Sequence, residues 1–264
     1  MKKLSILTAS FFLSLMSYAQ TTTNFVLEKK GTVNATQAMS KEVSMKLQNL
    51  EAPSPDGNST KSMLLRKKAL IEAKYPRTAA RSSNRGIESN DTLAIGTSFL
   101  SNIGSAGNPS DNSMAISNDG IVVSAYNSAI FVRDTENDST IGEIALNQFS
   151  AQIGMNFDNF DPKMIYDPEN DRFMLIYLAG RTESNSFIVV CFSETKDPMG
   201  NWNVYSLPGN PLNDTSWSDY PAISMTKDEA FITINLLNPG GSWQTSFKQT
   251  VIWQIDKYDG YTGN

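Results

Sequence analysis

The sequence predicts an all-β fold, because short apolar strands recur in the second half of the chain in a repeated order. In each of three copies, an Asp opens one apolar strand, a second acidic residue beside a turn opens another, and a third apolar strand follows. The opening residues Asp111, Asp161 and Asp219 lie 50 and then 58 positions apart. A period near 50 residues built from short strands is typical of β-propeller blades. We therefore expect residues 91–264 to form about three blades of a β-propeller.

The strands of each copy are expected where apolar runs lie between turn residues such as Gly, Pro, Asn and Asp. The expected strands are 111–116, 119–126, 129–132 and 141–146, then 161–166, 171–177, 187–192 and 202–207, then 219–224, 228–234 and 251–255. The third copy shows no fourth strand, and a closed propeller needs about four to eight blades. We expect a partial propeller that is either the N-terminal part of a longer protein, truncated at the C-terminus, or completed by partner chains.

A short helical extension is expected before the repeats. Residues 1–19 have the charged start, apolar stretch and small-residue cleavage site of a secretory signal peptide. The chain is therefore predicted to be exported to the periplasm, the cell surface or the exterior, without a membrane span in its mature form. Residues 20–90 form the extension, with one basic helix over 60–74 capped by Ser59. This helix is expected to dock on the acidic repeats rather than to serve as a membrane-surface or nucleic-acid arm.

Composition excludes several kinds of chemistry. The chain has no His and one Cys, so Ser-His-Asp and Cys-His catalysis, His-bound metals and an intrachain disulfide are all ruled out. Residues 20–87 carry a net charge of +7, and residues 88–264 carry −14. An acidic repeat region would repel phosphates, so no nucleic-acid partner is expected. Cys191 lies in an apolar run and is expected to be buried and inert.

The three opening Asp residues are the main candidates for a site, because a propeller gathers the starts of its inner strands around one axis. Two interpretations remain open. Asp111, Asp161 and Asp219 could accept backbone N–H groups and close the preceding loops, or they could line a ligand face together with Trp217 and Tyr220. Flat aromatic side chains beside carboxylates are typical of sites for sugars or peptides.

No cofactor is expected, although calcium is an alternative at two acidic turns. Asp134 to Asp138 and Asp167 to Asp171 each crowd oxygen ligands into a few residues. Neither run has the spacing of an EF-hand loop, and solvated hairpin turns explain both runs better.

One hairpin resembles a known motif. The stretch Thr195-x-Asp197-x-x-Gly200-x-Trp202 resembles the Asp-box of bacterial propellers, Ser/Thr-x-Asp-x-Gly-x-x-Trp, with the Gly one position later. Asp197 is expected to bind backbone N–H groups of the turn, and Trp202 to pack between strands. Residues 92–264 are similar to the sialidase-like (BNR) blades of secreted bacterial propeller proteins of poorly defined function.

The predicted architecture is also similar to the five-bladed glycosidases. That resemblance implies Asp111 as the base, Asp161 as the residue that tunes its partner, and Asp219 at the acid position, where the family has Glu. Taken together, the sequence predicts a noncatalytic propeller module that binds a glycan or a protein. A propeller-type glycoside hydrolase that uses the three carboxylates is the alternative.

Overall fold

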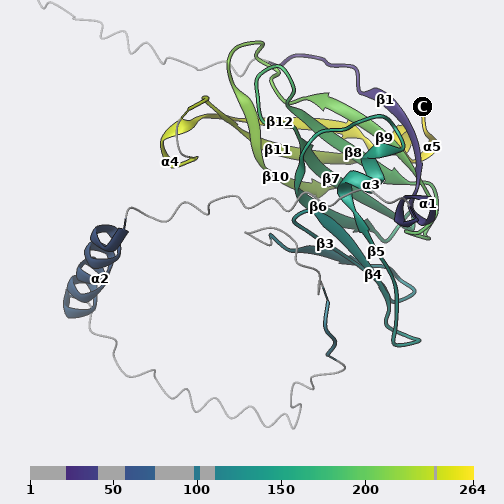
Figure 1. The fold of residues 1–264 in the computed structure, drawn as a ribbon, viewed down its shortest axis with the longest axis horizontal. Coiled ribbons are helices and arrows are strands. Elements are labelled where there is room, and N and C mark those ends of the chain that lie inside the picture. Colours follow the sequence, from purple (N-terminus) through teal and green to yellow (C-terminus); the bar gives the residue numbers. More distant parts are fainter. Residues whose placement is uncertain (1–21, 41–56, 75–97, 102–110, 241–242) are drawn as a thin grey trace, which may run out of the picture.

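A computed structural model describes residues 22–40, 57–74, 98–101, 111–240 and 243–264 (Figure 1). These residues are mostly β-structure and form three antiparallel sheets, so the all-β prediction is confirmed. The first sheet holds β2 (Ser113–Ile116), β3 (Ile121–Tyr126), β4 (Ala129–Asp134) and β5 (Ser139–Ala145). The middle sheet holds β6 (Asn159–Asp167), β7 (Arg172–Ala179), β8 (Phe187–Ser193) and β9 (Asn201–Pro208), with β1 (Glu28–Asn34) added beside β9. The third sheet holds β10 (Trp217–Met225), β11 (Glu229–Leu237) and β12 (Phe247–Asp256).

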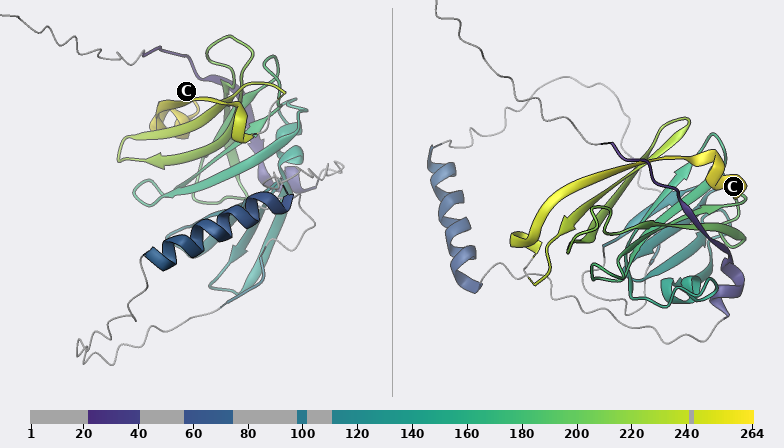
Figure 2. Two further views of the ribbon diagram at one scale, coloured as in Figure 1. Left: turned by 90° about the vertical axis from the view of Figure 1, so that its left-hand side faces the viewer. Right: turned by 90° about the horizontal axis from the view of Figure 1, so that it is seen from above.

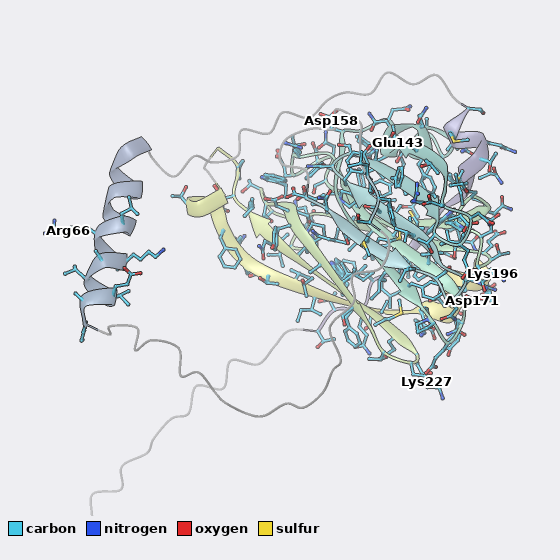
Figure 3. All side chains as sticks on the ribbon, turned by 90° about the horizontal axis from the view of Figure 1, so that it is seen from below. Arg66, Glu143, Asp158, Asp171, Lys196 and Lys227 are labelled. Carbon is cyan, nitrogen blue, oxygen red and sulfur yellow. The ribbon has the colours of Figure 1, made fainter. Side chains whose placement is uncertain are left out.

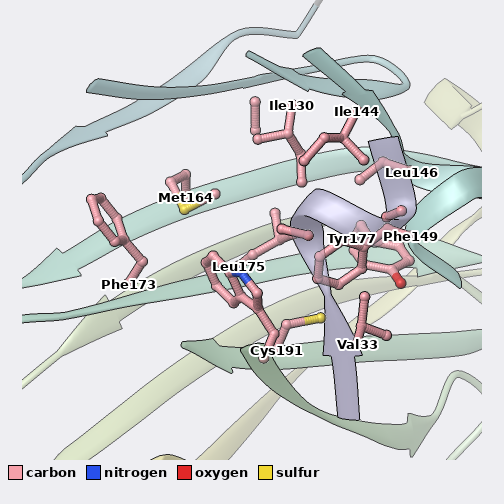
Figure 4. Close-up of a cluster of buried hydrophobic side chains, with 14 of the residues drawn as sticks. Val33, Ile130, Ile144, Leu146, Phe149, Met164, Phe173, Leu175, Tyr177 and Cys191 are labelled. Atoms are coloured by element: carbon pink, nitrogen blue, oxygen red, sulfur yellow. The ribbon is translucent and has the colours of Figure 1, made fainter. Parts of the chain in front are cut away.

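Both faces of the middle sheet are buried. Along β7, Phe173, Leu175 and Tyr177 belong to a core shared with the first sheet (Figure 4). The alternate residues Met174 and Ile176 belong to a second core, shared with the third sheet. Side chains of a strand point alternately to opposite faces, so a sheet with neighbours on both sides reads as a continuous apolar run. That is the pattern seen in β7 and β8.

The first strands of the three sheets lie side by side. Strand β6 contacts both β2 and β10, and Figure 2 shows the sheets fanning outward from this junction. A cross-sheet hydrogen bond supports the contact, because the Met164 amide donates to Ser113 Oγ at 3.0 Å. The residues at which the three strands begin are therefore brought close together.

Strand β1 comes from the N-terminal part of the chain and pairs antiparallel with β9. Val33 is fully buried and packs in the core between the first and middle sheets (Figure 4). Asn34 then caps the short helix α1 (Ala35–Met39), and its backbone is held by the side chain of Gln152. The sequence did not predict this strand.

Helix α5 (Lys257–Thr262) closes the far end of the middle and third sheets. Lys257 Nζ donates to Asp167 Oδ2 at 2.6 Å, and both side chains are almost fully buried. Tyr261 also donates a hydrogen bond to Asp167, at 2.8 Å. Burial raises the pKa of Asp167, but the hydrogen bonds from Lys257, Asn170 and Tyr261 outweigh it, and the pKa is lowered.

All eleven strands expected in the repeats are present, with ends shifted by a few residues. The basic helix is also present as α2 (Gly57–Lys74), although it begins before Ser59, which therefore lies inside it and is not its cap. The other four described helices were not predicted: α1, α3 (Leu146–Ala151), α4 (Trp243–Ser246) and α5. The predicted signal peptide, residues 1–19, lies outside the described residues.

Candidate functional site

The first strands of the three sheets share a backbone feature at or near their starts. Asp111, Asp161 and Tyr220 all have left-handed backbone conformations, with φ of 41°, 50° and 50°. In β6 the pairing with β7 gains one extra residue between Phe160 and Lys163, and in β10 the pairing with β11 gains one between Asp219 and Ala222. Each extra residue is a β-bulge, which bends a strand and redirects its side chains.

Proline explains why the bulge forms there. Pro162 and Pro221 directly follow the left-handed residues. Proline lacks an N–H group and is tolerated in a sheet mainly at edges and bulges. The prolines also show that Tyr220, not Asp219, is the residue equivalent to Asp161. The sequence alignment that makes Asp219 equivalent to Asp161 was therefore wrong by one position. In the structure, Asp219 occupies the position equivalent to Phe160, just before the bulge.

The three predicted carboxylates do come together. Asp161 is 9% exposed, and its pKa is raised to about 7 by burial first, and then by the charges of Asp219 and Asp111. Burial also raises the pKa of Asp219, against opposing hydrogen bonds from the Tyr220 amide and from the Asp161 side chain. Below about pH 7, Asp161 therefore carries the proton of this pair and donates a hydrogen bond to Asp219. Asp161 lies in the middle sheet, Asp219 lies in the third sheet, and Asp111 lies just before the first strand of the first sheet.

Two cations face the same cluster. Lys163 and Arg181 both lower the pKa of Asp161, in opposition to the neighbouring carboxylates. The guanidinium of Arg181 lies 4.1 Å from the centre of the Phe160 ring, and burial lowers the pKa of Arg181. These cations offset the carboxylates, so the cluster is not a strongly anionic patch.

The cluster is also tied to the first sheet through Asn127, which is fully buried. The Asp161 amide donates to Asn127 Oδ1 at 3.1 Å. This hydrogen bond fixes the backbone of the bulge against the turn between β3 and β4. It satisfies a donor that the bulge removes from the strand ladder.

The two aromatic candidates have different surroundings. Tyr220 is 67% exposed, and Lys163 Nζ lies 5.8 Å from the centre of its ring. Trp217 is half-buried and packs against the core between the middle and third sheets. Tyr220 is therefore available to a ligand, whereas much of Trp217 stabilises the core.

The acidic turns proposed as calcium alternatives use their oxygens within the protein. Asp134 Oδ1 accepts the amides of Glu136 and Asn137, and Asp167 Oδ1 accepts two amides of its own turn in the same way. This geometry supports the hairpin-turn interpretation. Among the described residues, no group of three or more acidic or Cys side chains is arranged to hold a metal ion.

The hairpin that resembles an Asp-box has the expected contacts. Asp197 Oδ1 accepts the Met199 amide at 2.9 Å, and Trp202 Nε1 donates to the Pro198 carbonyl at 2.9 Å. Trp202 is 1% exposed and lies in the core between the first and middle sheets. Asp197 and Trp202 therefore stabilise the fold and lie outside the candidate site.

Lys163, Arg181 and Asn127 were missed by sequence reasoning. Lys163 lies two residues after Asp161, so alternation along the strand would have placed both on one face. Asn127 and Arg181 lie in loops, and neither has a pattern that predicts its position.

Comparison with protein families, curated proteins and solved structures found no match to this chain. Within the residues the structure describes, no helix has the length and apolar character needed to cross a bilayer.

Proposed function

We propose that the three sheets are adjacent blades of a β-propeller, and that the chain is an exported, noncatalytic module that binds a glycan or a protein. Support for the propeller comes from the sheet order. In each sheet the strands of one copy follow each other in sequence order, with β1 added outside β9 in the middle sheet. The first strand of the middle copy, β6, contacts both β2 and β10. Support for export comes from the signal-like sequence of residues 1–19.

The observation that carries the proposed function is the junction of Asp111, Asp161 and Asp219. The three residues come from β6, from β10 and from the segment just before β2, so no single hairpin turn requires these side chains to meet. Buried polar groups that serve no local turn are typical of binding sites. Ligand contacts are assigned to this junction, together with Tyr220 and the exposed part of Trp217.

The charges favour an uncharged polar ligand. Lys163 and Arg181 offset the carboxylates, and a protonated Asp161 can donate a hydrogen bond as well as accept one. The exposed ring of Tyr220 provides a flat surface on which a sugar ring or a peptide unit can lie. A glycan or a polypeptide segment fits this combination, whereas nucleic acid does not.

One observation favours the alternative, a propeller-type glycoside hydrolase. A carboxyl group with a pKa near 7 can act as a general acid at neutral pH. However, glycosidases hold their two carboxyl groups about 5 to 9.5 Å apart, and hydrogen-bonded carboxyl groups lie closer than that. The hydrogen bond from Asp161 to Asp219 therefore leaves Asp111 as the second carboxylate of such an enzyme.

Glycan and peptide arrays test the binding function. The chain without residues 1–19 should bind a defined subset of ligands, and Tyr220→Ala should weaken that binding at least tenfold. Tyr258→Ala is the matched control, because Tyr258 is 39% exposed on α5, away from the junction. Absence of binding on both arrays, or equal binding by the two variants, would contradict the proposal.

A hydrolysis assay separates the alternative. The protein would be incubated with the same glycans and the released sugars measured, with Asp161→Asn as the comparison. If the protein releases sugars and Asp161→Asn does not, the protein is a hydrolase and the assignment as a noncatalytic binding module is wrong. Turnover that is unchanged in this variant would place the chemistry elsewhere.

A further inference from the structure

The third sheet differs from the middle sheet in having one uncovered face. In β11, Ala230, Ile232 and Ile234 point into the core shared with the middle sheet. The intervening residues Phe231 and Thr233 therefore point to the other side, which we call the outer face. Its central residues, across the three strands, are Ala222, Ser224, Phe231, Thr233, Ile252 and Gln254.

The outer face mixes apolar and polar side chains at its centre and is acidic at one end. Ile252 is 67% exposed, and Ala222, which lies in the same row on the far side of Thr233, is exposed as well. Glu229 and Asp256 face each other across β11 and β12 on this same side. In the described part of the chain, no element is packed over these side chains as the third sheet is packed over β7 and β8.

Helix α2 has the opposite combination of properties. Every side chain from Leu65 to Lys74 is exposed, among them Leu65, Leu70 and Ile71 at 58%, 62% and 57%. The helix carries five basic residues and one acidic residue. Figure 3 shows the side chain of Arg66 projecting from it. In proteins, most of the stability of a helix comes from packing one of its faces against another surface, and no side chain from Leu65 to Lys74 is buried.

We propose that α2 docks on the outer face of the third sheet, as a cover that the chain supplies itself. Leu70 and Ile71 would pack over Ile252 and Phe231, and Arg66, Lys67 and Lys68 would lie within reach of Glu229 and Asp256. The helix is about 27 Å long and β12 about 33 Å, so the two can lie along each other.

The connections permit this placement. Residues 41–56 join α1 to α2, and a stretch of that length spans up to about 50 Å. Charge complementarity distinguishes α2 from a second copy of the sheet, because two outer faces would bring Glu229 and Asp256 against like charges. Burial of Leu70 and Ile71 against the sheet adds an apolar driving force. An anionic lipid surface could also bury them, so membrane binding is one outcome of the test below.

Zero-length carbodiimide crosslinking tests the proposal on the unaltered protein. Peptide mapping should recover bonds from Lys67 or Lys68 to Glu229 or Asp256 within one molecule. The contribution of charge to docking is tested with the variant Arg66→Glu/Lys67→Glu/Lys68→Glu. Its effect is measured as the rate of disulfide formation in the cysteine pair described in the next paragraph.

Disulfide trapping provides the matched comparison, because the single native thiol, Cys191, is fully buried and does not compete. Ile71→Cys/Ile252→Cys should form an intramolecular disulfide at least tenfold faster than Ile71→Cys/Met114→Cys. Met114 is 63% exposed on β2 and serves as the control surface. Adding the three Glu substitutions should slow the first pair at least tenfold, with the near-UV circular dichroism unchanged.

Three outcomes would overturn the proposal. Equal oxidation rates for the two pairs would show that α2 has no preferred surface. Disulfides between molecules at Ile252→Cys would assign the face to a second copy. Binding of α2 to anionic vesicles without any carbodiimide bond to the third sheet would assign the helix to a membrane surface.

Discussion

Asp161 and Asp219 share a hydrogen bond, although they belong to different sheets and lie at different positions relative to the bulges of their strands. Asp161 is the left-handed residue of its bulge, whereas Asp219 directly precedes the left-handed residue Tyr220. The two carboxyl groups meet because the bulges turn β6 and β10 toward each other. A junction of this kind has measurable consequences for stability and for binding.

The first prediction concerns pH. Asp161 has a pKa of about 7 in the folded protein and an ordinary value of 3.8, so between these pH values the folded state holds a proton that the unfolded state releases. Stability should therefore fall as pH rises from about 4 to 7, by up to about 1.4 kcal/mol per pH unit. Urea unfolding across this range measures the slope.

Asp161→Asn should flatten that slope. Asn mimics the protonated acid, and it tolerates the left-handed backbone that this position requires. Asp228→Asn, in an exposed turn, is the control and should leave the slope unchanged. An equal slope in the protein and in Asp161→Asn would show that Asp161 is ionised throughout.

The second prediction concerns the buried pair of Lys257 and Asp167. Lys257→Met leaves a buried carboxylate without its cation and should lower the free energy of unfolding by about 3 to 5 kcal/mol. Lys257→Met/Asp167→Asn removes that charge, and Asn can still accept the amides of the turn. The double variant should recover at least about 1 kcal/mol, measured by urea unfolding. A double variant less stable than Lys257→Met would contradict this account.

The third prediction tests whether β1 is part of the folded unit. Val33→Ala should lower the free energy of unfolding by about 2 kcal/mol, because Val33 is fully buried in the core. Val26→Ala is the matched control, since Val26 is 90% exposed and its truncation should change stability by less than about 0.5 kcal/mol. Equal effects of the two substitutions would mean that β1 does not hold its place beside β9 in solution.

The fourth prediction separates stability from function at Tyr220. A left-handed backbone is costly for Tyr and acceptable for Asn, so Tyr220→Asn should raise the free energy of unfolding by up to about 1 kcal/mol. The same substitution should weaken binding of any array ligand, because it removes the exposed ring. Thermal unfolding and a binding titration on the same sample measure both effects. A destabilised variant with intact binding would refute the assignment.

The strands of the repeats could be predicted because their apolar runs are long and bounded by turn residues. Strand β1 could not be predicted in this way, because it lies at a sheet edge and buries only Val33 fully. Its partner β9 is also far away in the sequence, so no local pattern marks the pairing. An edge strand of this kind is selected by long-range contacts rather than by its own composition.

The candidate site was only partly predictable. The meeting of Asp111, Asp161 and Asp219 followed from the spacing of the copies, but their equivalence did not. An alignment of the copies on Pro162 and Pro221 would have made Tyr220 the residue equivalent to Asp161. The buried pair of Lys257 and Asp167 gave no signal, because Lys257 follows the last strand and lies 90 residues from its partner.

The double-sided burial of the middle sheet also determines how the chain can vary. In β11 every second residue faces the outer side and has room to change, so a saturation mutagenesis scan should show tolerance with a period of two. From Phe173 to Ala179 both orientations are enclosed, and the scan should find no permissive site in that run. Substitutions that accumulate during evolution should therefore be concentrated in the first and third sheets, and β7 should change little.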